Sequence, residues 1–155
     1  MSLVKVQGNI SGTGTLTIAA PNTNTDRTLT LPDVTLTFAG VDVAQSFTAA
    51  QRGTVFALTD GATITPDFAV ANNFSVTLGG NRTLANPTNL VAGQSGVIKL
   101  TQDGTGGRTL AFGSYWDFAA GTAPTLTTAA NAVDILAYYV DSTTNITARL
   151  IGDRK

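Results

Sequence analysis

The sequence predicts an all-β protein, in which an N-terminal β arm precedes an antiparallel β-sandwich or jelly-roll domain. Three observations support this fold class. The 155 residues include no Glu and are rich in Thr, Val, Leu, Ala, Gly and Asn, a composition that favours strands and tight turns over helices. Apolar and polar residues alternate with a period of two in many short segments, as in strands with one buried face. Turn-forming residues interrupt these segments roughly every 8–12 residues, which is typical of sandwiches and jelly rolls.

Residues 1–44 form the predicted arm. Their alternating pattern predicts short strands that Pro21, Pro32 and Gly40 separate. Strands of about four or five residues are too short to be stable alone. We therefore expect the arm to be buried against another sheet or another copy of the chain, through the apolar side chains of Leu16, Ile18, Leu29, Leu31, Leu36 and Phe38.

Residues 42–52 contain the one helix that the sequence predicts. Ser46 is a suitable N-cap, and Gly53 is a suitable end. Because this helix would have roughly two turns at most, we expect it to act as a hinge between the arm and the domain of residues 45–155.

The domain contains a series of predicted strands. One runs into the turn at Asp60-Gly61. In the next, Phe74, Val76 and Leu78 share one face and Ser75 and Thr77 share the other, so the first three are expected in the core.

Two hairpins complete the predicted domain. The first joins strands 96–102 and 108–112 across the sequence "DGTGG". The second joins "AVDILAYYV" and "ITARLIG" across "DSTTN".

The tripeptide Arg-Thr-Leu occurs three times, at 27–29, 82–84 and 108–110, each time after a turn-forming stretch. We interpret each copy as the start of a strand, with Arg solvated at the sheet edge and Leu opening the buried row. The alternative is that these Arg side chains bridge to Asp residues of a neighbouring subunit.

The inventory of reactive side chains predicts a non-enzymatic protein without cofactor or metal. His, Cys and Glu do not occur, which excludes Ser-His-Asp catalysis, thiolate chemistry and most transition-metal sites. Hydrolysis by two carboxylates stays formally open. The candidates sit among turn-forming residues, so we interpret them as turn residues; they are Asp67, Asp103, Asp117 and Asp134.

Charge and hydropathy exclude two classes of partner. The formal net charge is −1 and no basic run occurs, whereas nucleic acids and anionic membranes bind clustered Lys and Arg. No apolar stretch approaches 18 residues, so no membrane insertion is expected.

The only Trp, Trp116, follows Tyr115 and precedes Phe118. We interpret this aromatic cluster as part of the core or of a subunit interface, where Trp and Tyr are favoured. The alternative is a surface site at which Tyr115 and Trp116 contact a receptor, for instance by stacking on the sugar rings of a host surface glycan.

Several blocks in order resemble a module of tailed-bacteriophage virion proteins: "FTAAQRGTV", "LTDGATITPDF", "NNFSVTLGGNRTLANPTNLVAGQSG", "QDGTGGRTLAFGSYWDF" and "GTAPTLTTAANAVDILAYYV". The arm sequence "GTLTIAAPNTNTDRTLTLPD" resembles short β repeats of phage fibres. The resemblance implies a structural virion protein, homotrimeric and without catalysis or cofactor. It would be assembled into the virion in the cytoplasm of the bacterial host.

Two functions follow from this resemblance. The short chain, with one arm and one domain, favours a capsid decoration or cement protein on the head exterior. In that role the arm would bind sister subunits, the major capsid protein or another virion protein. The alternative is a tail-fibre or receptor-binding protein that contacts host surface glycans.

Overall fold

The computed structural model divides the chain into two units, Met1–Ser46 and Phe47–Lys155. It describes residues 11–15, 17, 22, 24–26, 28, 44, 46, 47 and 49–154. All nine strands of the described residues belong to the second unit. The six apolar arm residues from Leu16 to Phe38 lie outside the described residues, so their predicted burial stays a prediction.

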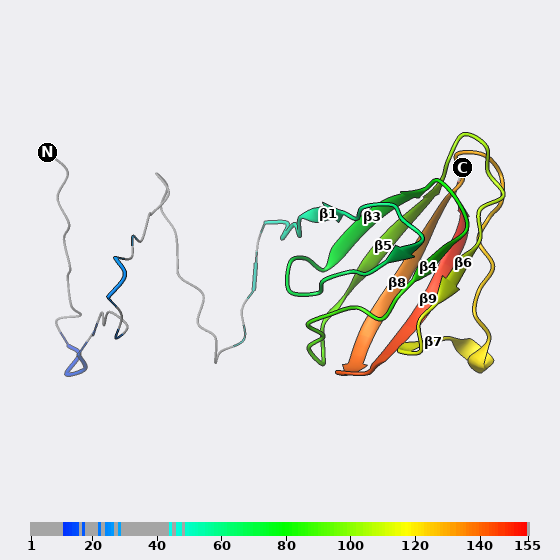
Figure 1. The fold of residues 1–155 in the computed structure, drawn as a ribbon. Coiled ribbons are helices and arrows are strands. Elements are labelled where there is room, and N and C mark those ends of the chain that lie inside the picture. The colour runs from blue at the N-terminus through cyan, green and yellow to red at the C-terminus, as the bar shows by residue number, and fades with distance from the viewer. Residues whose placement is uncertain are drawn as a thin grey trace, which may run out of the picture. The chain divides into compact units, whose positions relative to one another are not determined.

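The regular elements of the second unit are almost all strands, which confirms the all-β class (Figure 1). A single 3-10 turn, η1, spans Ala119–Gly121. The strands are β1 (Val55–Ala57), β2 (Thr63–Ile64), β3 (Asn73–Leu78), β4 (Arg82–Leu84), β5 (Ser95–Gln102), β6 (Leu110–Phe112), β7 (Trp116–Asp117), β8 (Val133–Ser142) and β9 (Asn145–Arg154).

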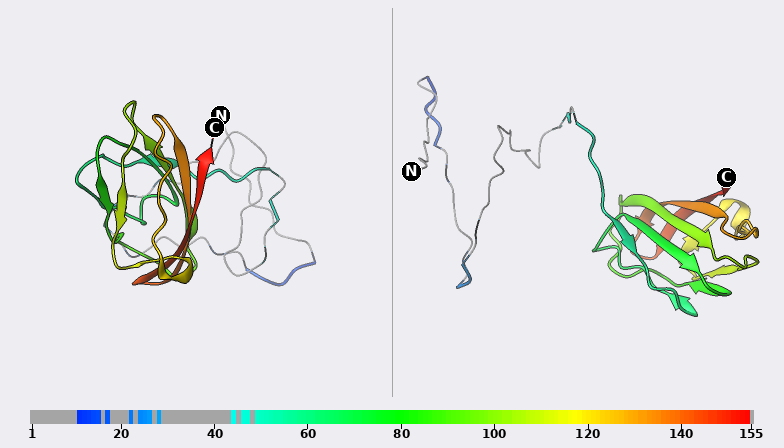
Figure 2. Two further views of the ribbon diagram at one scale, coloured as in Figure 1. Left: turned by 90° about the vertical axis from the view of Figure 1, so that its right-hand side faces the viewer. Right: turned by 90° about the horizontal axis from the view of Figure 1, so that it is seen from above.

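The strands form two sheets that face each other (Figure 2). The larger sheet has the order β1-β3-β5-β8-β9-β7, and the smaller has the order β2-β4-β6. The chain crosses from one sheet to the other and back, so that each strand lies parallel to the strand one circuit earlier. We call each circuit a rung: rung 1 is β1 and β2, rung 2 is β3 and β4, and rung 3 is β5 and β6.

The sheets of the described residues are therefore mixed, and the prediction of an antiparallel domain holds only in part. Only the pairs β5–β8 and β8–β9 are antiparallel. The hairpin predicted from "AVDILAYYV" and "ITARLIG" is confirmed as β8–β9, although its register shifts near both ends.

The hairpin predicted across residues 103–107 is also wrong, because β5 and β6 belong to different sheets. The side chain of Gln102 explains the difference. Its amide accepts a hydrogen bond from the Arg108 N–H at 2.8 Å and donates one to the Arg108 carbonyl at 2.9 Å. These bonds occupy the backbone groups of Arg108 that an antiparallel partner would use, and the chain turns the corner into the smaller sheet.

The sequence predicts a helix within residues 42–52. The described part of that segment contains no helix; it comprises residues 44, 46, 47 and 49–52. All of these described residues are exposed. A helix of two turns needs tertiary packing to be stable, and exposed residues provide none.

The core lies between the two sheets. The row Phe74, Ile98 and Leu136 runs across three neighbouring strands in register, and all three side chains are fully buried. As predicted, Val76 and Leu78 share this face, while Ser75 and Thr77 lie on the other. Ile64 and Leu84 supply the facing row from the smaller sheet, and Phe68 stacks between Phe74 and Tyr138.

Gly96 in β5 allows one close approach on which this packing depends. The Asn72 carbonyl accepts hydrogen bonds from the Tyr138 hydroxyl at 2.7 Å and from the Val97 N–H at 3.2 Å. A Cβ on Gly96 would collide with that carbonyl and with the Tyr138 hydroxyl. Burial also raises the pKa of Tyr138 to about 12.

We predict that Gly96→Ala lowers the free energy of unfolding by more than about 2 kcal/mol, because the added methyl group displaces backbone rather than a flexible side chain. Urea denaturation followed by Trp116 fluorescence measures the loss. The matched control is Gly104→Ala, where a Cβ meets open space. Equal stabilities of the two variants would contradict the prediction.

Candidate interaction site

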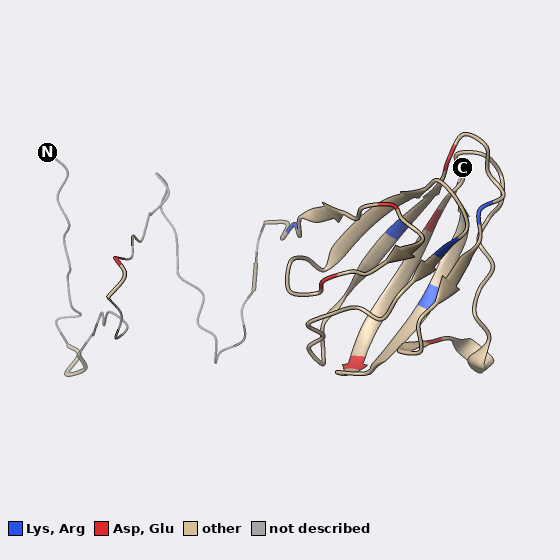
Figure 3. Ribbon diagram, in the orientation of Figure 1, with Lys and Arg blue, Asp and Glu red and all other residues tan. Residues whose placement is uncertain are grey.

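Charged residues in the second unit are few and spread over strands and loops, with no single patch of one sign (Figure 3). Across the described residues, no helix is long and apolar enough to cross a membrane. The polar side chains of the unit make individual contacts, and both of its ion pairs lie at the corners where the chain passes from the larger to the smaller sheet.

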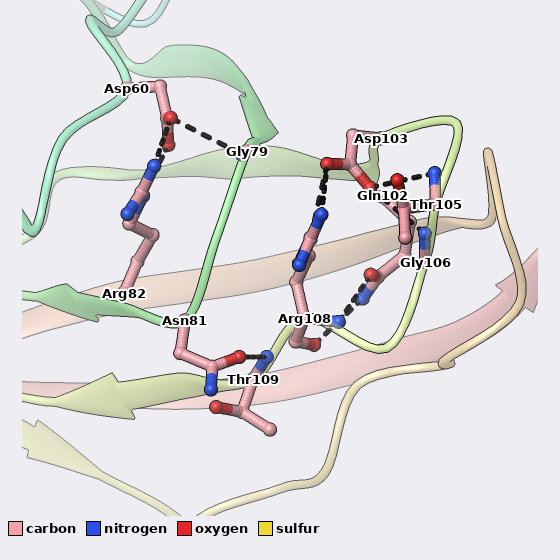
Figure 4. Close-up of polar contacts among 10 residues, drawn as sticks. All are labelled: Asp60, Gly79, Asn81, Arg82, Gln102, Asp103, Thr105, Gly106, Arg108 and Thr109. Atoms are coloured by element: carbon pink, nitrogen blue, oxygen red, sulfur yellow. Dashed lines mark hydrogen bonds and ion pairs between the residues drawn. The ribbon is translucent and has the colours of Figure 1, made fainter.

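One corner joins the three rungs to one another (Figure 4). Arg82 of rung 2 donates two hydrogen bonds to Asp60 of rung 1, from Nε at 2.8 Å and from a terminal nitrogen at 2.6 Å. The Asn81 side chain accepts a hydrogen bond from the Thr109 N–H of rung 3 at 3.1 Å. These bonds link neighbouring rungs outside the strands themselves.

Within rung 3, Arg108 pairs with Asp103, and the closest nitrogen and oxygen are 2.7 Å apart. The N–H groups of Thr105 and Gly106 also donate to Asp103. The Arg108 hydrogen bond, with help from these two N–H groups, lowers the pKa of Asp103 to about 2. Arg82 similarly holds the pKa of Asp60 below its usual value.

These pairs show where the Arg side chains of two Arg-Thr-Leu copies lie. Arg82 opens β4 as predicted, whereas Arg108 precedes β6, which begins at Leu110. Neither guanidinium is simply solvated, because each is paired with an Asp of its own unit and only about a quarter exposed. The predicted solvated position was thus wrong for both. The copy at 27–29 has Arg27 and Leu29 outside the described residues.

The remaining carboxylates proposed for hydrolysis hold loops in place. Asp67 accepts bonds from the Ala69 N–H and the Asn89 side chain. Asp117 accepts one from Asn145, and the buried Asp134 accepts one from the Thr127 N–H. Within the described residues, no three metal-binding side chains gather into one group.

Trp116 lies in the core and is 5% exposed. Its Nε1 donates to the Ala85 carbonyl at 3.1 Å, and its ring meets Phe68, Phe112 and Tyr138 edge to face. Tyr115 is partly buried against the same core. The structure thus brings both predicted contact residues together as packing groups, and contact of either with a receptor stays a prediction.

An opening at rung 1 is the feature that sequence reasoning missed. Phe56 of β1 faces inward, opposite Phe74, and the two rings are 6.3 Å apart. Phe74 is fully buried, yet Phe56 is 46% exposed. The reason is position: β1 and β2 each end their sheet, so the described residues place no further rung over Phe56.

A groove of about 400 Å³ lies at this position. We call it the first-rung opening. All of its lining residues come from 56–65, among them Phe56, Leu58 and Ile64 on the apolar side and Asp60 and Thr63 on the polar side. It combines exposed apolar surface with two strand edges that have no ladder partner among the described residues, and such a surface accepts an added strand.

Comparison with known proteins gives one match. Residues 64–145, just over half of the chain, match the model of a family described as "Putative phage tail fibre C-terminal domain". No curated protein and no solved structure matches the chain. The matched residues begin in β2 and end at the first residue of β9, so they contain rungs 2 and 3 and the core around Trp116.

We predict that Trp116→Ala destabilises the protein by about 3–5 kcal/mol, because the change leaves a cavity among packed rings and an unpaired Ala85 carbonyl. Thermal and urea unfolding measure the loss. Tyr139→Ala is the matched control, since Tyr139 is 49% exposed and should cost little. A stable Trp116→Ala protein that fails only in host adsorption would instead favour the receptor interpretation.

We also predict an acid-sensitive corner. A carboxyl whose pKa is lower in the folded than in the unfolded state stabilises the protein above the unfolded pKa, and this contribution disappears as the pH falls towards the folded value. For Asp103 the window lies between about pH 4 and pH 2. The urea midpoint of the wild type should fall across this window, and the isosteric Asp103→Asn variant should lose less. Identical pH dependence in the two proteins would contradict this assignment.

Proposed function

The chain belongs to the phage tail fibre C-terminal domain family, and from this premise we propose that it forms the distal part of a tail fibre. It is a bacteriophage structural protein. The observation that carries the finer proposal is the family match over residues 64–145, which lies wholly within the strand-built second unit.

The fold supports this proposal. Stacked rungs bury their apolar side chains against the rung before and the rung after, as in other repeat architectures. Such a stack extends along one direction, which suits an elongated fibre. Asp60 and Asp103 each form an ion pair with an arginine. Carboxylates paired in this way support a structural rather than a catalytic role.

Head decoration, which the short chain favoured, is the competing location. Both locations use the same chemistry, namely burial of apolar strand surface against other virion proteins. The family match favours the tail, and the position of the protein on the particle distinguishes the two.

The test uses the absence of Cys from the sequence. Thr143 lies in the exposed turn between β8 and β9, so Thr143→Cys adds a single accessible thiol. Phage particles carrying this variant are labelled with maleimide-coupled gold and examined by electron microscopy. We expect gold on the tail fibres only.

The control is phage with the Cys-free wild-type chain, which reports labelling of other virion proteins. Gold distributed over the whole head would overturn the tail-fibre proposal and assign the chain to head decoration.

A further inference from the structure

The arm and rung 2 share a longer sequence repeat than the Arg-Thr-Leu tripeptide. The pattern Arg-Thr-Leu-x-x-Pro occurs at residues 27–32 and again at 82–87. The third tripeptide, at 108–110, is not followed by Pro at this spacing. The structure shows what the copy at 82–87 does, and this gives the copy at 27–32 a physical interpretation.

Residues 82–87 are a strand followed by a corner, fitted to β2. Thr83 and Leu84 pair in parallel with Thr63 and Ile64, and Leu84 is fully buried. Beyond Pro87 the chain continues beside rung 1, where the Thr88 N–H donates to the Pro66 carbonyl at 2.9 Å. The hexapeptide thus occupies one edge of β2.

The other edge of β2 faces the first-rung opening, and this edge requires the same kind of segment. An inward Leu at the position that corresponds to Leu84 would pack beside the buried Ile64 and cover the exposed Phe56. Asp60 also lines the groove. Its oxygens accept two hydrogen bonds from Arg82 and one from the Gly79 N–H, and a carboxylate has about four acceptor sites, so at most one is left for a further donor.

The spacing along the chain favours a segment from another copy. Residues that pair across neighbouring rungs are separated in the sequence by 18 positions for Val55 and Asn73 and by 28 positions for Arg82 and Leu110. Thr28 precedes Thr63 by 35 residues, which is longer than either rung. The described residues 44, 46, 47 and 49–54 include no strand that could act as an intervening rung.

We propose that residues 27–32 of a second copy of this chain add a parallel strand to β2 at the first-rung opening. Thr28 of the second copy lies opposite Thr63, Leu29 lies opposite Ile64 and covers Phe56, and Arg27 lies within reach of Asp60. This strand exchange goes beyond the proposed function, since it holds for a protein on the head or on the tail. Failure of the gold-labelling experiment therefore leaves it untouched.

The test is a disulfide between two full-length single-Cys variants. Thr28→Cys and Thr63→Cys are prepared separately, one with a mass tag, then unfolded, mixed, refolded together and oxidised. Neighbouring parallel positions have the short Cα separation that a disulfide requires. We expect a mixed disulfide that links the two variants, identified by mass spectrometry.

The matched control pairs Thr28→Cys with Thr83→Cys, because both edges of β4 are already occupied by β2 and β6. A Thr28–Thr63 disulfide no more abundant than this control overturns the proposal. In a chain carrying both substitutions, a disulfide formed within a single copy at high dilution also overturns it, because the arm then docks on its own chain.

Light scattering provides an independent readout. The wild type should have a mass that is a multiple of 15.9 kDa. Leu29→Asp should lower this mass to that of one chain, since a charge cannot enter the apolar groove, whereas Thr30→Asp, on the opposite side of the added strand, should not. A wild type that stays at the single-chain mass at all concentrations contradicts the exchange.

Discussion

The structure depends on one constraint: in the row of inward side chains that starts at Phe56 in the larger sheet, a side chain is buried only where another strand lies on each side of it. The row that starts at Phe56 shows this directly. Phe74, Ile98 and Leu136 each have a neighbouring strand on both sides and are fully buried, whereas Phe56 has one on a single side and remains 46% exposed. Burial here is a property of stacking order and not of residue type, since both Phe56 and Phe74 are phenylalanines on the same face.

The corner contacts depend on the same stacking. Asp60 and Arg82 belong to successive rungs, so their pair forms only when β2 and β4 are in register. The pair of Asp103 and Arg108 lies within rung 3 and shapes the turn that separates β5 from β6. In a chain with 12% charged residues, these ion pairs use four of the few charges to select register and turn geometry. Partly exposed pairs contribute modestly to stability, so we attribute their role mainly to this selection.

Local pattern was enough to predict part of this fold. The period of two identified Phe74, Val76 and Leu78 as one buried face, and adjacent apolar segments identified the β8–β9 hairpin, because both features depend on residues close in sequence. The parallel rungs were missed because their partners are about 18–28 residues apart, and Asp-Gly turn signals are the same for a hairpin and for a corner. The exposure of Phe56 could not be predicted at all, since it reflects which strand ends the sheet. Trp116 was interpreted as part of the core or of a subunit interface, because a large aromatic side chain beside Tyr115 and Phe118 has much area to bury, and the structure places it in the core.

The two ends of the stack differ, and this difference gives the unit a direction. After rung 3 the antiparallel pair β8–β9 continues the larger sheet and covers the inward side chains of β5, so Ile98 and Leu100 are buried. At rung 1 the described residues provide no such cover, and Phe56 and Val55 remain exposed on an edge strand. Exposed apolar edges invite pairing with other chains unless a partner occupies them. The first-rung opening is therefore the place in the described residues where exposed apolar side chains and two unpaired strand edges lie together.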